Sequence, residues 1–405
     1  PLAARYSRSL RGAGDFKRVF GTVFGSETHR FTPIKEMRVR SEEKCPRGQD
    51  SGGEEDTGEK DMDKNEQRAI EERLKGQIAS YHEAALLFTA VTAGLPDLLN
   101  AEPRTAEALA SDLGLKTEPM RRFLRGLVAM QLCEALDDGR FALTPAAKAL
   151  TFGNPSNLSE KAFVAVGQYW MPWMSMMYSL RTGEPSLPFA LNKSFADWRG
   201  PKAEEGRFFF RYVAKEELAN PNGLKDALGD LPEGTVIASL GGGYGAWLAD
   251  VLSQGPTLKA VVFDAPPVLD DAMRLFDALE LADRVAFLPG DVLEAISVSA
   301  DVFVLKSVLQ QHDDAGAARI LENCRKTMGK SGRLIVYERF MPEDARDDPD
   351  AIMLDLHMLA ITGGKTRTKT EMDMLIAGAG LAVAGHRKTA DRMSVLDVRC
   401  PEPDP

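Results

Sequence analysis

A glycine-rich turn followed by two spaced carboxylates is the part of this 405-residue sequence that most clearly predicts chemistry. The apolar residues 235–240 are typical of a strand, and they lead through Gly241-Gly242-Gly243-Tyr244-Gly245 into a helical run. Asp264 ends the next strand pattern, where a carboxylate can accept hydrogen bonds from both hydroxyls of a ribose. Asp291 ends the following strand pattern and can read an adenine amino group. The three strand ends predict a site for an adenine nucleoside.

The residues after the turn narrow the choice of nucleoside. A dinucleotide fingerprint needs a small residue where this chain has the bulky Leu248, and no GKS or GKT lysine follows the glycines. Neither a pyrophosphate site nor a P-loop is therefore predicted. S-adenosylmethionine (SAM), which has a ribose and an adenine but no phosphate, is the cofactor that remains.

Strands alternate with helices through the second half of the chain, an arrangement that brings strand ends to one edge of a sheet. Short β-branched strand patterns occupy residues 235–240, 259–264, 284–289, 301–306 and 333–338. Helical runs at 246–253, 268–278 and 315–328 separate them. We expect an α/β fold with a Rossmann-like, doubly wound and mostly parallel sheet, and we assign residues 226–405 to this SAM-binding domain.

The segment before that domain is mainly helical. Residues 65–160 read as helix, turn, helix and a short hairpin around Asp137-Asp138-Gly139, which is a winged-helix pattern. A net charge of −10 argues against nucleic-acid binding, so we expect a dimerisation domain. Residues 161–225 are rich in aromatic and Met side chains and are expected to form a helical connector that lines the substrate pocket, with core packing as the alternative.

Residues 1–64 are expected to be a disordered leader, basic at first and then acidic. The basic part resembles a transit peptide, so we expect an intracellular protein, either cytoplasmic or directed to a plastid or mitochondrion. No run reaches the ~18–20 apolar residues of a membrane helix. The five histidines show no ligand-like spacing, so no metal site is expected. A reducing compartment is favoured because four cysteines lie far apart, at Cys45, Cys133, Cys324 and Cys400.

Several motifs between residues 75 and 400 together resemble the class I SAM-dependent O-methyltransferases of the plant caffeate and hydroxyindole type. They include SLGGGYGAWL, VVFDAPPVL, LPGDVLE, VLKSVLQQHDDAGAARIL and LIVYERF. The resemblance implies a homodimer that acts on a small molecule. Ser239 stands where the family often has an acidic residue that contacts the methionine moiety. The resemblance implies cofactor contacts from Gly241, Gly243, Asp264, Asp291, Val292 and Lys306.

The chain departs from that family at the catalytic position. Members read roughly LKxxLHDWxD, in which the His removes the acceptor proton, whereas this chain reads LKSVLQQHDD and has Gln310 there. An amide cannot act as a base. Thr366 replaces a second family carboxylate, and Glu338 keeps its place. His312 and His357 are the alternative bases, the latter on a helix expected beside the pocket.

The missing base changes which acceptors are expected, because general-base catalysis typically contributes ~10²- to 10⁴-fold. The first expectation is S-methylation of a thioether, whose sulfur has no proton to lose. Some relatives of this family methylate 4-methylthio-2-hydroxybutyrate in dimethylsulfoniopropionate biosynthesis. The alternatives are O-methylation of an acidic phenol or enol with His312 or His357 as base, and a SAM-binding homologue without catalysis. The expected substrate contacts, whose rings would face the new cation, are Tyr169, Trp170 and Trp173, together with Arg211 and Met358.

Overall fold

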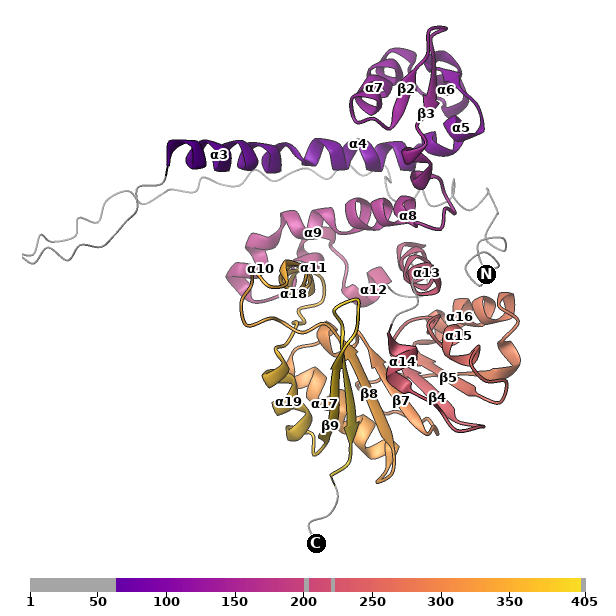
Figure 1. Ribbon diagram of the computed structural model, residues 1–405, viewed down its shortest axis with the longest axis vertical. Helices are drawn as coiled ribbons and strands as arrows, with labels where there is room; N and C mark the ends of the chain where they lie inside the picture. The colour runs from indigo at the N-terminus through magenta and orange to yellow at the C-terminus, as the bar shows by residue number, and fades with distance from the viewer. Residues whose placement is uncertain (1–62, 200–203, 220–222, 402–405) are drawn as a thin grey trace, which may run out of the picture. The chain divides into compact units, whose positions relative to one another are not determined.

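The computed structural model describes residues 63–199, 204–219 and 223–401 (Figure 1). The leader predicted for residues 1–64 lies outside these ranges except for Asp63 and Lys64. The chain divides into two units, of which the smaller ends at Ala84 and the larger continues from Ala85. In the smaller unit, α3 (Lys64–Ala79) begins where the Asp63 carboxylate accepts the N–H of Asn65, and none of its residues is buried. The helix α4 (Tyr81–Thr92) follows it.

The larger unit begins with the winged-helix pattern expected from the sequence. Its small antiparallel sheet has the order β1-β3-β2. Leu95, Leu109 and Leu124 are buried at its centre, because each helix turns one apolar stripe inward. The elements are α5 (Leu95–Ala101), β1 (Arg104–Thr105), α6 (Ala106–Leu113), α7 (Thr117–Ala129), β2 (Cys133–Ala135) and β3 (Arg140–Leu143).

The segment between the two sheets, called the connector below, is helical. The buried Ser186 hydroxyl donates to the carbonyls of Pro172 and Ala360, so it ties two connector helices to a helix of the cofactor domain. The connector elements are η1 (Ala146–Leu150), α8 (Leu158–Ala162), η2 (Phe163–Gln168), α9 (Trp170–Met174), α10 (Met176–Thr182), α11 (Ser186–Leu191), α12 (Phe195–Arg199), α13 (Glu204–Ala219) and α14 (Leu224–Leu228).

The main sheet has seven strands in the order β6-β5-β4-β7-β8-β10-β9. The five strands from β6 to β8 are parallel, and β10 pairs antiparallel with both β8 and β9. Each predicted strand matches an observed one to within a residue. Four of the five are mainly buried apolar segments, whereas β6, at the sheet edge, is only partly buried. The strands are β4 (Val236–Leu240), β5 (Lys259–Asp264), β6 (Val285–Pro289), β7 (Val302–Lys306), β8 (Arg333–Glu338), β9 (Ala382–Lys388) and β10 (Ser394–Arg399).

Helices cover both faces of this sheet (Figure 1), and each face has its own apolar core. The first strand of this sheet, β4, lies between β5 and β7, so the strand order reverses there, and ligands of such sheets bind at the carboxyl ends of the strands at this point. The predicted doubly wound fold is confirmed. Its other helices are α15 (Leu248–Leu252), α16 (Pro266–Ala278), η3 (Ala282–Arg284), η4 (Leu309–Gln311), α17 (Asp314–Met328), α18 (Pro349–Ile361) and α19 (Lys369–Gly378).

No single helix among the described residues is long and apolar enough to cross a membrane, and only the bent combination of Lys64–Thr92 with Leu95–Ala101 has that length and composition. Within the same residues, no group of three His, Cys, Asp or Glu side chains is placed to hold a metal ion.

Candidate functional site

The glycine turn after β4 requires glycine for two physical reasons. Gly241 and Gly243 have φ values of 63° and 78°, in the left-handed region that side chains disfavour. A Cβ on Gly241 would lie 3.3 Å from a methyl of Val292, and one on Gly243 would lie 3.1 Å from the Phe210 ring. The turn therefore presents bare backbone at the switch point of the sheet, where a ligand can approach closely.

Asp264 ends β5 directly beside this turn. Its carboxylate accepts the N–H groups of Gly243 at 2.9 Å and Ala265 at 2.7 Å. Burial raises the pKa of Asp264 to about 6, and the charge of the nearby Asp291 adds to that rise, while the two N–H groups oppose it. A carboxylate has about four lone-pair sites, so acceptor sites remain for ribose hydroxyls.

The expected adenine site lies at the next strand end. Asp291 is exposed, and its carboxylate accepts the N–H of Leu293 at 2.8 Å. Val292 is buried against the glycine turn and offers an apolar wall. Bare glycine backbone, a buried acceptor, an exposed acceptor and an apolar wall together fit the ribose and adenine of a nucleoside.

Lys306 ends β7 on the other side of the switch point. Its ammonium lies 2.6 Å from Oε1 of Glu217, a buried residue of α13. Oε2 of Glu217 accepts the N–H of Trp247, two residues after the glycine turn, at 3.2 Å. Glu217 has no signal in the sequence, because it is one carboxylate on a helix without a motif.

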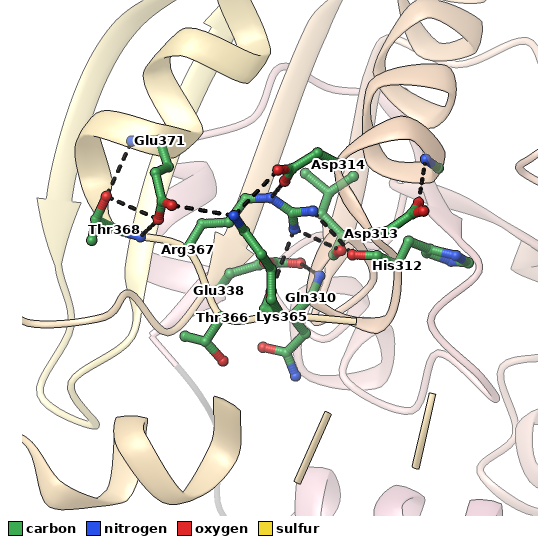
Figure 2. Close-up of polar contacts among 12 residues, drawn as sticks. Gln310, His312, Asp313, Asp314, Glu338, Lys365, Thr366, Arg367, Thr368 and Glu371 are labelled. Atoms are coloured by element: carbon green, nitrogen blue, oxygen red, sulfur yellow. Dashed lines mark hydrogen bonds and ion pairs between the residues drawn. The ribbon is translucent and has the colours of Figure 1, made fainter. Parts of the chain in front are cut away.

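Gln310 lies in η4, just after β7, and Glu338 ends the neighbouring strand β8. The N–H of Gln310 donates to Oε1 of Glu338 at 3.1 Å (Figure 2). Burial raises the pKa of Glu338 to about 7, although the Gln310 N–H and the charge of Arg367 lower it. The side chain at position 310 is an amide, and a fully buried carboxyl group accepts the backbone N–H of the same residue.

Gln310 and Thr366 each have a buried side-chain oxygen that forms no hydrogen bond with the described residues. Among the described residues, neither Oε1 of Gln310 nor Oγ1 of Thr366 has a hydrogen-bond partner. Figure 2 shows both side chains extending in the same direction, away from the Arg367 guanidinium. Buried polar groups normally have partners, so both atoms are free to bond with the polar part of a bound molecule.

Arg367 holds the Gln310 loop in position. Its guanidinium is buried and donates to the carbonyl oxygens of Leu309 at 2.9 Å and His312 at 3.0 Å, and to the carboxylate of Asp314 at 2.9 Å. These bonds occupy the planar fork of the side chain. Arg367 therefore fixes the η4 backbone, and with it the Gln310 amide.

Of the two candidate histidines, one points away from Gln310 and the other accepts a hydrogen bond from a tryptophan. The His312 ring points away from the Gln310 amide (Figure 2). Burial lowers the pKa of His312, and the nearby charges of Asp291 and Asp313 oppose that change. Nδ1 of His357 accepts the indole N–H of Trp173 at 3.1 Å. An indole N–H can only donate, so a neutral His357 ring carries its proton on Nε2.

The structure brings some of the expected substrate contacts together. The Tyr169 ring lies edge-on to the His357 ring at 4.3 Å between centroids, and Trp173 stacks on the same ring at 6.2 Å. Met358 is buried on α18 beside His357. Two further expected contacts are half-buried: Trp170, at the start of α9, and Arg211, on α13. No contact described in the structure joins either residue to this cluster.

A glycine turn, Asp264 and Asp291 at the switch point of a mixed seven-stranded sheet define a nucleoside site of the methyltransferase type. The chain belongs to the O-methyltransferase family. Residues 215–382 match the family's O-methyltransferase domain, and residues 77–152 match its O-methyltransferase dimerisation domain. The predicted family resemblance is thereby confirmed, as is the cofactor, SAM.

Individual relatives act on different atoms. The chain is similar to the mitomycin biosynthesis 6-O-methyltransferase of Streptomyces lavendulae, at 32% identity over 78% of this chain and 90% of the relative. It is 28% identical to the 8-amino-8-demethylriboflavin N,N-dimethyltransferase of Streptomyces davaonensis, over 82% of this chain and 96% of the relative. A neocarzinostatin-biosynthesis O-methyltransferase, solved with SAM and 2-hydroxy-5-methyl naphthoic acid, has a TM-score of 0.71 and 26% identity, covering 80% of this chain and 98% of that one. The chain is therefore a SAM-dependent methyltransferase of small molecules.

Proposed function

We propose that this protein methylates a nitrogen, or an oxygen that is already ionised near neutral pH, on a small aromatic molecule. The observation that carries this proposal is the buried Gln310 amide with an unpartnered Oε1 at the position of the family's catalytic His. An amide cannot take a proton from a hydroxyl, so the acceptor atom must be nucleophilic without first losing a proton, as a neutral amine or an already ionised oxygen is. The names of the relatives, which include both oxygen and amino-nitrogen acceptors, support this class of acceptor.

When bound, SAM supplies an electrophilic methyl group on a sulfonium sulfur. Oε1 of Gln310 accepts the N–H of an aromatic amine and thereby orients the nitrogen lone pair, while the Thr366 hydroxyl binds a neighbouring polar group. The faces of Tyr169 and Trp173 pack against the aromatic plane. Alignment and exclusion of water then supply the rate enhancement in place of proton removal.

The thioether expected from the sequence shares the base-free chemistry, because its sulfur also attacks without losing a proton. None of the three relatives described above is named for a sulfur acceptor, so nitrogen and oxygen are the acceptors proposed here. The His357-assisted route to a phenol is disfavoured by the hydrogen bond that Trp173 donates to Nδ1. A sulfur acceptor is instead an outcome of the test.

The test is mass spectrometry of products formed from isotopically methyl-labelled SAM and a panel of aromatic amines, acidic phenols, weakly acidic phenols and thioethers. Label on nitrogen supports the proposal, as does label on oxygen at a rate that follows ionisation of the acceptor itself. Label on sulfur alone would overturn the choice of acceptor. Rapid transfer to weakly acidic phenols near neutral pH would overturn base-free attack.

Gln310→His tests the role of the amide directly. An imidazole placed beside Glu338 is expected to speed transfer to weakly acidic phenols by about 10-fold or more, with no gain on amines. Gln311→His is the matched control, because the neighbouring amide donates to the Ser307 carbonyl and does not contact Glu338. A gain on amines as well would show that residue 310 acts in some way other than proton removal.

The dimerisation domain also leads us to propose a homodimer in solution. Size-exclusion chromatography with light scattering on the full chain measures this, and a monomer at micromolar concentration would overturn it.

A further inference from the structure

A buried ion pair, Glu217–Lys306, lies at the switch point of the sheet. Lys306 Nζ and Glu217 Oε1 are 2.6 Å apart, and the side chains are 16% and 7% exposed. Such a pair must offset the cost of removing two charges from water, so its position calls for an explanation beyond stability.

The pair lies beside the backbone that is expected to approach SAM. Glu217 Oε2 accepts the N–H of Trp247, just after the glycine turn. A Cβ on Gly242 would lie 3.2 Å from the Ser239 hydroxyl and 4.0 Å from the Lys306 carbonyl oxygen. The glycine turn, Ser239 and the ion pair thus share one edge of the sheet.

The helix α13 presents a continuous face to the glycine turn. Phe210, Ala214 and Glu217 follow one another at helical spacing of four and three residues. The Phe210 ring contacts the position of Gly243 and stacks on Tyr244 at 5.6 Å between centroids. Glu217 is therefore held at the turn by a packed helix rather than by a free side chain.

We propose that Glu217 and Lys306 together bind the amino-acid end of SAM. The Glu217 carboxylate pairs with the α-ammonium of SAM, and the Lys306 ammonium pairs with its α-carboxylate. Ser239, at the end of β4, is neutral, so Glu217 supplies from α13 the negative charge that an acidic residue at position 239 would provide. An ion pair complements a zwitterion, and binding leaves no uncompensated buried charge.

Calorimetry with two ligands tests this proposal. SAM carries the amino-acid end, whereas 5′-methylthioadenosine has the same nucleoside and sulfur without it. Glu217→Gln is expected to weaken SAM and S-adenosylhomocysteine binding by about 10- to 100-fold and to leave methylthioadenosine within about twofold. Equal losses for all three ligands would assign the pair to structure alone, and unchanged SAM affinity would also overturn the proposal.

Three further variants separate a role in binding from a role in folding. Glu217→Ser combined with Ser239→Asp moves the carboxylate from α13 to β4 and is expected to recover about tenfold of the lost SAM affinity. Glu216→Gln is the matched control, because that carboxylate accepts from the Asn157 amide at 2.8 Å instead. If Glu217→Gln does not fold, Glu217→Met with Lys306→Met removes both charges together. That variant must bind methylthioadenosine normally and SAM weakly, and normal SAM binding by it would refute the proposal.

Discussion

The buried Glu338 carboxyl group makes stability depend on pH in a direction that can be measured. It is 1% exposed at the end of β8, and Oε1 accepts the N–H of Gln310. Burial raises its pKa from 4.5 to about 7. In the unfolded chain the proton is lost near pH 4.5, whereas the folded protein keeps it until about pH 7.

Between these two values the folded state holds a proton that the unfolded state has released, so folded stability falls as pH rises. Above pH 7 the loss is complete and amounts to roughly 3 kcal/mol, because each pKa unit corresponds to about 1.4 kcal/mol. At pH 5 the loss is only about 1 kcal/mol by the same relation.

Glu338→Gln keeps an oxygen that can accept the Gln310 N–H but removes the titration. We expect its free energy of unfolding, relative to the wild type, to be about 2 kcal/mol more favourable at pH 7.5 than at pH 5. Urea unfolding followed by tryptophan fluorescence at the two pH values measures this change. Glu322→Gln, which replaces an exposed carboxylate of α17, serves as the control and should change by less than about 0.5 kcal/mol at either pH.

Measuring at two pH values separates the effect of charge from that of packing, because a packing defect in Glu338→Gln would change the free energy of unfolding equally at pH 5 and pH 7.5. An equal difference at pH 5 and 7.5 would refute the raised pKa. A larger deficit at pH 7.5 would show that Arg367 and the loop N–H groups stabilise the ionised form more than burial opposes it.

Three other substitutions test separate parts of the molecule. Asp264→Ala should weaken SAM binding by about 1–3 kcal/mol in calorimetry, and unchanged affinity would remove the ribose contact. Lys215→Met should lower the free energy of unfolding by about 3–5 kcal/mol in urea, because it leaves Glu160, now 2.6 Å from the ammonium, buried without its partner. Trp173→Phe removes the donor to His357 Nδ1 and should allow transfer to weakly acidic phenols; a double variant with His357→Phe should abolish that gain.

The sheet and the nucleoside site were predictable because their signals are local. Each parallel strand is a short, mainly apolar segment, and the turn at Gly241–Gly245 follows β4 without interruption. Asp264 ends β5 and Asp291 follows the end of β6 by two residues, and parallel strands bring their carboxyl ends to one edge. The glycine motif, the strand patterns and the topology of the parallel sheet therefore predict the same site before any tertiary contact is known.

The remaining parts of the site depend on contacts between distant segments. Glu217 meets Lys306 across 89 residues, and Trp173 meets His357 across 184. Neither pair has a sequence signal, because only packing of the connector on the cofactor domain brings them together. Sequence spacing alone also left His312 as a candidate base, whereas the folded loop turns its ring away from Gln310.

The charge state of Glu338 has a consequence for the choice of acceptor. Below pH 7 the carboxyl group behind Gln310 is largely protonated, so an ionised oxygen acceptor meets no negative charge there. Above pH 7 Glu338 ionises and repels such an acceptor while a neutral amine is unaffected. The rate of oxygen methylation should therefore rise as the acceptor ionises and fall as Glu338 ionises. The rate of nitrogen methylation should not show these two opposing effects. In Glu338→Gln the second effect disappears, so the rate on an acidic phenol should keep rising with pH until the acceptor is fully ionised.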